Sequence, residues 1–213
     1  MTGAARRPGP SSTRAGAPTT PLTALWEVAL ATGLRRAELA GLMWRYVDLD
    51  AGVIRVRRST TAVRGRAVTT EGKGKAAGKT HAAHRDVPIG PSTVALLRAH
   101  KIAQAPGATH VFTEIDGEAV HPDRISKRFT AAAKRAGLHK TGLGVHSLGH
   151  YAITSWLRSG VPVATVAKIA GHEDISITLR LYAHVVREDD SLIAAAMEAS
   201  LYGPAPVAAG GAV

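Results

Sequence analysis

The chain has 213 residues, and 27 lysines and arginines against 16 aspartates and glutamates give it a formal net charge of +11. That length is sufficient for one well-buried domain. Because the sequence contains no cysteine, disulfide frameworks, thiolate catalysis and cysteine-based metal sites are excluded. The basic charge indicates a polyanionic partner, and nucleic acid is favoured over a membrane surface because no segment is apolar for long enough to span a bilayer.

Both ends of the chain predict tails. Residues 1–20 are rich in proline, glycine and serine and lack apolar periodicity, so we expect a disordered arm there. Its arginines are not followed by an apolar run, so no secretory signal is predicted and the protein is expected to be cytoplasmic. Residues 202–213 predict a second disordered tail. The folded domain is therefore expected to span residues 21–201.

Helical spacing of apolar residues opens the folded region, and a period-two pattern follows it. Proline at the start of the first helix and glycine at its end are typical helix boundaries. The expected elements are a helix from Pro21 to a stop at Gly33, a helix over 36–43, a β-hairpin around the turn Asp50-Ala51-Gly52, a mobile loop or ragged hairpin over 62–84, and a short strand at 87–89 that ends the sheet.

The second half of the chain is predicted to be almost entirely helical. Apolar residues recur at helical spacing in these segments, which supports this assignment. In the first of the helices, over 91–104, the residues expected to be partly buried are Val94, Leu96, Leu97 and Ile102. The expected fold class is therefore mainly α with a small antiparallel β-sheet (α+β). The predicted elements are helices over 91–104, 121–137, 145–159, 162–171, 174–182 and 187–201, with a short extended piece at 111–112.

Basic residues concentrate in two segments, one between residues 55 and 86 and one in the helix expected over 121–137, whereas acidic residues prevail after residue 172. A basic loop is often only solvated surface. Two basic segments on a basic chain nevertheless favour a face that follows DNA phosphates. The residues predicted to bind DNA are Arg55, Arg57, Arg58, Lys73, Lys75, Arg124, Lys127 and Arg128.

The stretch from Val145 to His184 contains four histidines, with a tyrosine two residues before the last of them, and helical lengths fall between these polar groups. Helices of this length, joined by short turns, can bring several of these polar side chains together in space. A site for phosphate chemistry requires such a cluster. A zinc hydrolase is a weaker alternative, because His146 and His150 are four residues apart but have no carboxylate in a recognised arrangement. The position of Tyr182 at the end of a helix is compatible with either a core aromatic side chain or an exposed phenol.

Cleavage of a phosphodiester needs a nucleophile, cations that hold the non-bridging oxygens, and a proton donor for the leaving oxygen. A tyrosine phenol can attack phosphorus and form a covalent phosphoester that conserves the bond for rejoining. Arginine suits the clamp because its planar guanidinium is bidentate and always charged. Lysine on a loop can reach the leaving oxygen, and histidine exchanges protons near neutral pH.

Several segments together resemble the catalytic domain of tyrosine recombinases, the phage integrase family, over roughly residues 20 to 200. Each match is weak alone, but their order and spacing make the combination specific. The matching segments are Ala31-Thr32-Gly33-Leu34-Arg35-Arg36-Ala37-Glu38-Leu39, Lys79-Thr80 with Arg85-Asp86-Val87-Pro88-Ile89, His146-Ser147-Leu148-Gly149-His150, Ala170-Gly171-His172, and Thr178-Leu179-Arg180-Leu181-Tyr182-Ala183-His184.

The resemblance implies a cofactor-free and metal-free reaction on double-stranded DNA, and docking of the C-terminal helix (187–201) on a neighbouring protomer. It also assigns roles to five residues, while His150 is expected to be a structural histidine that packs under the site. In these roles Tyr182 is the nucleophile of a 3′-phosphotyrosyl intermediate, Arg35 and His172 bind the phosphate, Lys79 protonates the 5′-oxygen, and His146 assists proton transfer.

One residue departs from the family pattern at a catalytic position. Gly149 stands where the resemblance implies the second clamp arginine, so one charge and its hydrogen-bond donors are absent there. Loss of one such preorganised group typically slows a reaction about 10²–10³-fold, and loss of an arginine on a transferring phosphoryl group can slow it about 10³–10⁵-fold. We therefore expect severely impaired strand cleavage, which Gly149→Arg should relieve.

A second departure is at the front of the chain. Family members usually place a helical core-binding domain before the catalytic domain, whereas a short arm stands in that place here, as in a truncated gene, a shortened expression product or a natural short form. Two other functions stay open beside an impaired recombinase. One is a non-catalytic DNA-binding remnant, and the other is an activity like that of type IB topoisomerases.

Overall fold

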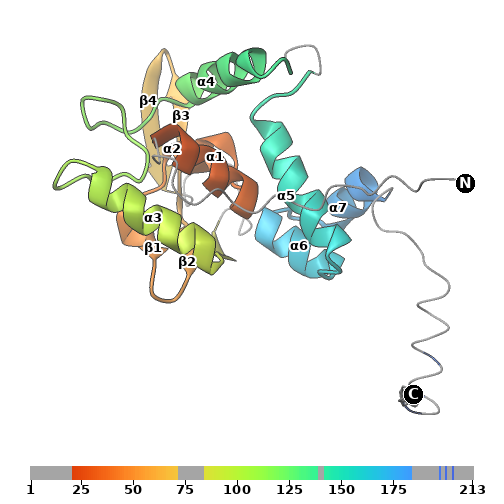
Figure 1. Cartoon of the computed structure of the whole chain (residues 1–213). Helices are drawn as coiled ribbons and strands as arrows, with labels where there is room; N and C mark the ends of the chain where they lie inside the picture. Colours follow the sequence, from red (N-terminus) through yellow and green to blue (C-terminus); the bar gives the residue numbers. More distant parts are fainter. Residues whose placement is uncertain are drawn as a thin grey trace, which may run out of the picture.

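The computed structural model describes residues 21–71, 84–138 and 142–183, together with residues 197, 200 and 203 (Figure 1). Several sequence predictions fall outside these residues. They concern the roles of Lys73, Lys75 and Lys79, the arm at 1–20, nearly all of the tail at 202–213, and most of the helix expected over 187–201 with its docking on a second protomer.

The front half contains the two predicted helices and two small antiparallel sheets. The predicted hairpin is confirmed, with β2 between β1 and β5 and Ile54 opposite both Val47 and Val87. In the described part of 62–84, a regular second hairpin replaces the expected ragged one. The elements are α1 (Pro21–Thr32), α2 (Arg36–Ala40), the 3₁₀ helix η1 (Trp44–Tyr46), β1 (Val47–Asp48), β2 (Val53–Val56), β3 (Arg58–Val63), β4 (Arg66–Glu71) and β5 (Arg85–Pro88).

The α2 helix is shorter than predicted, because it ends at Ala40 rather than at Met43. The next residue, Gly41, lies against the backbone of β3, where an added Cβ would be 3.0 Å from the carbonyl carbon of Ser59. The absence of a side chain therefore lets β3 approach the end of α2. This contact depends on tertiary structure, which the apolar pattern of the segment does not reveal.

The remaining described elements are helices. The expected extended piece at 111–112 is not a strand, although isolated bridges flank it on both sides. Ile102, expected to be partly buried, is 85% exposed, whereas His100 on the inner side of the same helix is buried and bonds the carbonyl of Val111. The helices are α3 (Pro91–Ala103), α4 (Pro122–Arg135), α5 (His146–Arg158), α6 (Val163–Ala170) and α7 (Ile175–Tyr182).

Two hydrophobic clusters hold these elements together. The larger cluster lies between α1, α2, α3, α4 and the β1-β2-β5 sheet, and includes Leu25, Leu39 and Ile54. The smaller cluster joins α5, α6 and α7. Figure 1 shows these three helices on one side of the molecule, where α5 packs against α1. The fold class is therefore as expected, mainly α with small antiparallel sheets. None of the described helices combines the length and apolarity that a membrane crossing needs.

Candidate functional site

A buried ion pair organises the front of the site. The carboxylate of Glu38 in α2 accepts two hydrogen bonds from the guanidinium of Arg85 in β5, at 2.8 and 2.9 Å. Both side chains are almost fully buried, with 7% and 4% exposed. Glu38 also accepts the backbone N–H of Arg35 at 2.8 Å, which caps the start of α2. Both residues lie within segments that resemble the family motifs, but no role was predicted for either from the sequence.

Two arginines bind the C-terminal end of α6. Arg35 donates to the carbonyl of Gly171 at 2.8 Å and to that of Ala170 at 3.4 Å. Arg85 donates from Nε to the carbonyl of Ile169. The last carbonyls of a helix lack intrahelical partners and carry partial negative charge, so these guanidinium groups satisfy and neutralise them. The side chain of Arg35 is still 52% exposed, which leaves part of its guanidinium accessible to a ligand.

His172 follows the glycine that ends α6. Gly171 has left-handed backbone angles, φ 71° and ψ 38°, and the N–H of His172 bonds back to the carbonyl of Ala167 at 3.0 Å. On the side chain, Nδ1 lies 2.7 Å from the hydroxyl of Thr178 in α7, which fixes the ring. Burial lowers the pKa of His172, and the neighbouring charges of Arg35 and Arg85 lower it further. The imidazole is therefore neutral at neutral pH.

Tyr182 is the last residue of α7. Its side chain is 3% exposed and packs against Ile153, Val166 and Ala170. Its hydroxyl lies 2.5 Å from Nδ1 of His150 in α5. Burial raises the pKa of the phenol, so the phenolate is disfavoured in this position. The aromatic ring is thus a core side chain, while its hydroxyl meets a polar group.

A cavity of about 500 Å³ brings most of the predicted site residues together. Glycine at 149 forms part of its wall, and a Cβ built there would lie 3.5 Å from the carbonyl oxygen of Gly33, an ordinary contact. The site residues in its lining are Arg35, His146, Gly149 and Tyr182, joined by Arg36 and His150. His172 is not in the lining, and Lys79 lies outside the described residues.

His150, expected from the sequence to be a structural histidine that packs under the site, lies in the wall of this cavity. Its ring meets the ring of His146 edge to face, with centroids 6.0 Å apart. The spacing of four residues that suggested a zinc pair places both rings on one face of α5, and that spacing could have identified His150 from the sequence. The described residues contain no group of three or more metal-ligating side chains.

Arg36 is a second arginine in the cavity wall. Its Nη1 lies 2.8 Å from the hydroxyl of Ser126 and 3.4 Å from the carboxylate of Asp123, both in α4. These contacts tie α2 to α4. The guanidinium of Arg36 therefore contacts α4 and does not take the place of the arginine missing at Gly149.

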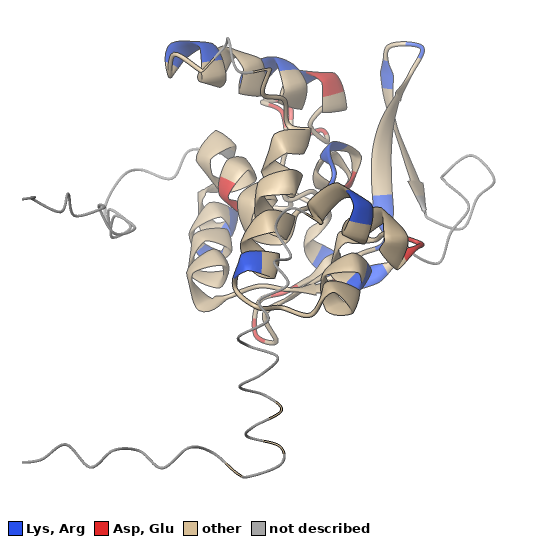
Figure 2. Cartoon of the chain, turned by 90° about the vertical axis from the view of Figure 1, so that its right-hand side faces the viewer, with Lys and Arg blue, Asp and Glu red and all other residues tan. Residues whose placement is uncertain are grey.

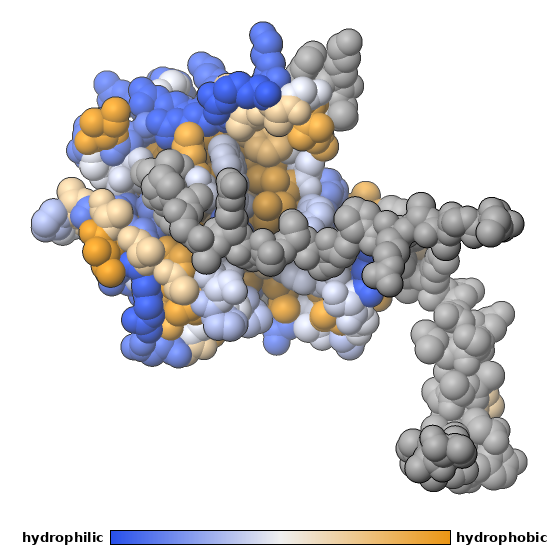
Figure 3. Space-filling view, in the orientation of Figure 1, coloured by the Kyte–Doolittle hydropathy of each residue, from blue (hydrophilic) through white to orange (hydrophobic). Residues whose placement is uncertain are grey.

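The described residues predicted to bind DNA lie in two parts of the fold, with Arg124, Lys127 and Arg128 on α4 and Arg55, Arg57 and Arg58 from β2 to the start of β3. Figure 2 shows lysine and arginine along α4 and the β3–β4 hairpin, and the hydrophilic surface over α4 is visible in Figure 3. Most of the predicted arginines form internal ion pairs, whereas Lys127 is exposed on α4. The pairs are Arg55 with Asp48 at 3.0 Å, Arg57 with Asp86 at 2.6 Å, and Arg124 and Arg128 with Glu114 at 3.1 and 2.7 Å; Arg58 lies against the sulfur of Met43.

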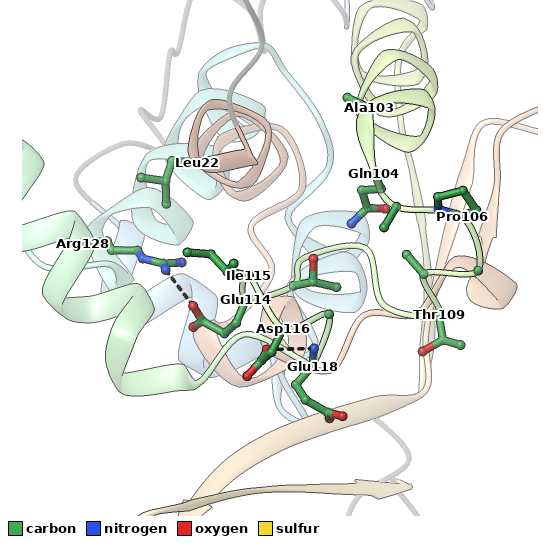
Figure 4. A pocket seen from close by; sticks show the side chains of 15 residues that line it. Leu22, Ala103, Gln104, Pro106, Thr109, Glu114, Ile115, Asp116, Glu118 and Arg128 are labelled. Atoms are coloured by element: carbon green, nitrogen blue, oxygen red, sulfur yellow. Dashed lines mark hydrogen bonds and ion pairs between the residues drawn. The ribbon is translucent and has the colours of Figure 1, made fainter.

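A larger cavity, of about 690 Å³, lies away from Tyr182 (Figure 4). It is lined by the end of α3, the 113–118 loop and Arg128 of α4. Its charged groups are mostly carboxylates, and Arg128 already bonds Glu114 there. An acidic lining repels phosphate, so the smaller cavity is the better candidate for phosphate chemistry.

Comparison with known proteins gives matches over most of the chain. The profile described as "Phage integrase family" matches residues 13–189. A tyrosine recombinase XerC-like protein of Caldanaerobacter subterraneus subsp. tengcongensis is 31% identical over 183 residues, covering 78% of this chain and 46% of the relative. Tyrosine recombinase XerC of Xanthomonas campestris pv. campestris is 34% identical over 163 residues, covering 76% and 44%. The chain spans about half the length of these curated relatives.

Solved structures share the fold. The Tn1549 transposon integrase, in complex with a circular intermediate DNA, aligns with a TM-score of 0.68 and 22% identity, covering 83% of this chain and 57% of that one. XerA recombinase aligns with a TM-score of 0.58 and 21% identity, covering 84% and 56%. At these identities the alignments establish a common architecture.

Proposed function

The chain belongs to the phage integrase family, and on this premise we propose that it binds double-stranded DNA with a site built to break and rejoin strands through a 3′-phosphotyrosyl intermediate. The observation that carries the proposal is the cavity that collects Arg35, His146 and Tyr182 from three separate helices or loops. These side chains supply a phosphate clamp, a proton-transfer group and a nucleophile.

The proposed roles follow from the contacts of each group. Arg35 keeps half of its side chain exposed while Glu38 and α6 hold it, so its position is fixed before a phosphate arrives. A neutral His172 can donate one hydrogen bond to a phosphate oxygen without binding a second proton. Lys79 is proposed, from the resemblance alone, to protonate the 5′-oxygen.

We further propose that cleavage is slow because Gly149 supplies no cation. Arg35 and Arg36 are the cationic side chains in the described lining of the cavity, and Arg36 contacts Ser126 and Asp123. One missing charge-stabilising group corresponds to about 10²–10³ in rate. This deficit favours a second candidate function, a DNA-binding protein that occupies its sites without cutting them.

Covalent trapping separates the two candidates. The full chain would be incubated with nicked duplexes of randomised sequence, whose cleavage releases a short strand and traps the protein–DNA adduct, and the products would be resolved on a denaturing gel. We expect little adduct from the parent, at least about 10²-fold faster adduct formation by Gly149→Arg, and none by Tyr182→Phe in that background. Gly149→Ala is the matched control, because it adds a side-chain carbon without a charge.

Three results would contradict parts of this account. Adduct formation by the parent as fast as by Gly149→Arg would overturn the impairment. Salt-sensitive DNA binding without any adduct from Gly149→Arg would support the non-cutting DNA-binding protein instead. Relaxation of a supercoiled plasmid by Gly149→Arg, without strand exchange, would indicate chemistry like that of type IB topoisomerases.

A further inference from the structure

The hydroxyl of Tyr182 meets His150 and not His146. Nδ1 of His150 lies 2.5 Å from Oη, and the two ring centroids are 5.8 Å apart. Within the described part of the chain, His150 is the hydrogen-bond partner found for this hydroxyl. Thirty-two residues separate the pair in sequence, so the contact depends on how α5 and α7 pack.

We propose that His150 is a catalytic residue: its Nδ1 accepts the phenolic proton of Tyr182 when the hydroxyl attacks a DNA phosphate. This inference rests on the proposed function and deepens it. As the Oη–P bond forms, the proton moves from Oη to Nδ1, and the bond from phosphorus to the 5′-oxygen breaks. The leaving 5′-oxygen takes its proton from a separate donor, and the imidazolium of His150 returns a proton to Oη when the strand is rejoined.

The surroundings of the phenol make such a base necessary. Its ring packs with Ile153, Val166 and Ala170 in one buried cluster, and only 3% of the Tyr182 surface is exposed. Burial raises the pKa of Tyr182, and spontaneous ionisation is therefore suppressed. A base at hydrogen-bond distance removes the need for a free phenolate, because the proton leaves as the new bond forms.

The cavity that holds His150 and Tyr182 also contains other charged and titratable groups. The charged and titratable groups of the same cavity are Arg35, Arg36 and His146, and the charge of His150 is also felt by His172. The ring of His146 meets that of His150 edge to face, with centroids 6.0 Å apart, so His146 can serve the phosphate or the leaving oxygen while His150 bonds Oη.

The hydrogen bond can be tested without DNA. The full chain would be labelled with ¹⁵N-histidine, and the Nδ1 resonance of His150 compared between the parent and Tyr182→Phe. We expect Nδ1 in the parent to show the shift of an accepting ring nitrogen, and to move toward the value of an unbonded ring nitrogen in the variant. An unchanged resonance would overturn the proposal, whatever the protein does to DNA.

The proton transfer itself is tested in the Gly149→Arg background with two substrates, an ordinary nicked duplex and one whose 5′-bridging oxygen is sulfur. Sulfur leaves without a proton, so it compensates for a lost proton donor but not for a lost base. His150→Asn keeps a hydrogen-bond acceptor near Oη but cannot act as a base at neutral pH. We expect it to slow adduct formation about 10²–10⁴-fold on both substrates. The proton-donor control, Lys79→Ala, should slow only the reaction of the oxygen substrate.

Each further outcome has a distinct meaning. If His150→Asn in the Gly149→Arg background forms adduct as fast as Gly149→Arg alone, His150 only orients the phenol. That result would refute the proposal. Rescue of His150→Asn by sulfur would move His150 to the leaving-group side and refute it as well. Absence of adduct from the Gly149→Arg chain on both substrates would count against the proposed function, and the ¹⁵N measurement would still decide whether the hydrogen bond exists.

Discussion

At the scale of single residues, Gly149 affects stability as well as charge. Its backbone is helical, and a Cβ there would meet Gly33 at 3.5 Å without a clash. Gly149→Ala should therefore raise the free energy of unfolding by up to about 1 kcal/mol, the usual difference between the two residues inside a helix. Gly149→Arg should gain less, because a cation in the first turns of α5 opposes the helix dipole. Urea titrations of the three proteins measure both effects, and a loss of stability in Gly149→Ala would mean that the cavity wall is already full.

The Glu38–Arg85 pair predicts a large loss of stability. Glu38→Ala leaves the guanidinium of Arg85 buried and without its carboxylate, which typically costs about 3–5 kcal/mol. Glu38→Gln keeps one oxygen acceptor and should cost less. Glu27→Ala, an exposed carboxylate on α1, is the matched control and should change the free energy of unfolding by less than about 0.5 kcal/mol. Equal denaturation midpoints for Glu38→Ala and Glu27→Ala would contradict the role of the pair.

His172 gives stability a pH dependence with a defined sign. Its pKa is lowered in the folded state, mainly by burial, so between that pKa and about 6.5 the unfolded chain binds more protons than the folded one. The free energy of unfolding should therefore fall as pH falls through this window. His110, whose pKa burial also lowers, contributes in the same direction. In His172→Asn the difference in stability between pH 7.5 and pH 5.5 should shrink; an unchanged difference would exclude this contribution.

At the scale of elements, the end of α6 positions the site. Gly171 adopts φ 71°, a conformation that costs an alanine about 1–2 kcal/mol. Gly171→Ala should therefore lower stability and also displace His172 and the carbonyls that Arg35 binds. Gly160, with φ 80° after α5, has open space around it and is the matched control. Gly160→Ala should lose a similar amount of stability in urea while retaining the adduct yield of its Gly149→Arg background, which Gly171→Ala should lose. Equal adduct yields from Gly171→Ala and Gly160→Ala would show that the C-terminal end of α6 does not position the site residues.

The extent to which the sequence predicts this fold depends on whether a feature is local. Helix boundaries marked by Pro21, Gly171 and Asp174 were predicted closely, because proline, glycine and a capping carboxylate act within one turn. The early end of α2 was not predicted, since it depends on the approach of β3 to Gly41. Residue patterns within a segment carry no information about such a contact.

The same distinction applies to the candidate site. The resemblance named Arg35, His146 and Tyr182, which the structure collects around one cavity. It did not name the partners that hold them, because Glu38 and Arg85 are 47 residues apart and Arg35 and Gly171 are 136 apart. Burial of the phenol was also open, since a tyrosine between Leu181 and Ala183 fits a core or a surface equally well. Tertiary packing decides these features.

At the scale of the whole molecule, the net charge of +11 predicts DNA binding that weakens steeply with salt. The location of the charge decides which lysines contribute. Lys127 is exposed on α4, beside the β3–β4 hairpin, whereas Lys101 of α3 lies over the ring of Trp44 at 5.2 Å. Each lysine carries the same charge, so alanine at either position lowers the net charge equally. If phosphates follow the α4 face, only Lys127 should contact them.

We therefore expect Lys127→Ala to reduce the slope of log affinity against log salt concentration by about 1, the value for one lost phosphate contact. Lys101→Ala should leave that slope unchanged. Fluorescence anisotropy with a labelled random-sequence duplex at several salt concentrations measures both slopes, and the comparison does not require cleavage. Equal reductions in the two variants would mean that the net charge of the chain attracts DNA without a preferred face. A reduction confined to Lys127→Ala would instead orient the duplex along α4, the helix that Arg36 ties to the cavity wall beside Tyr182.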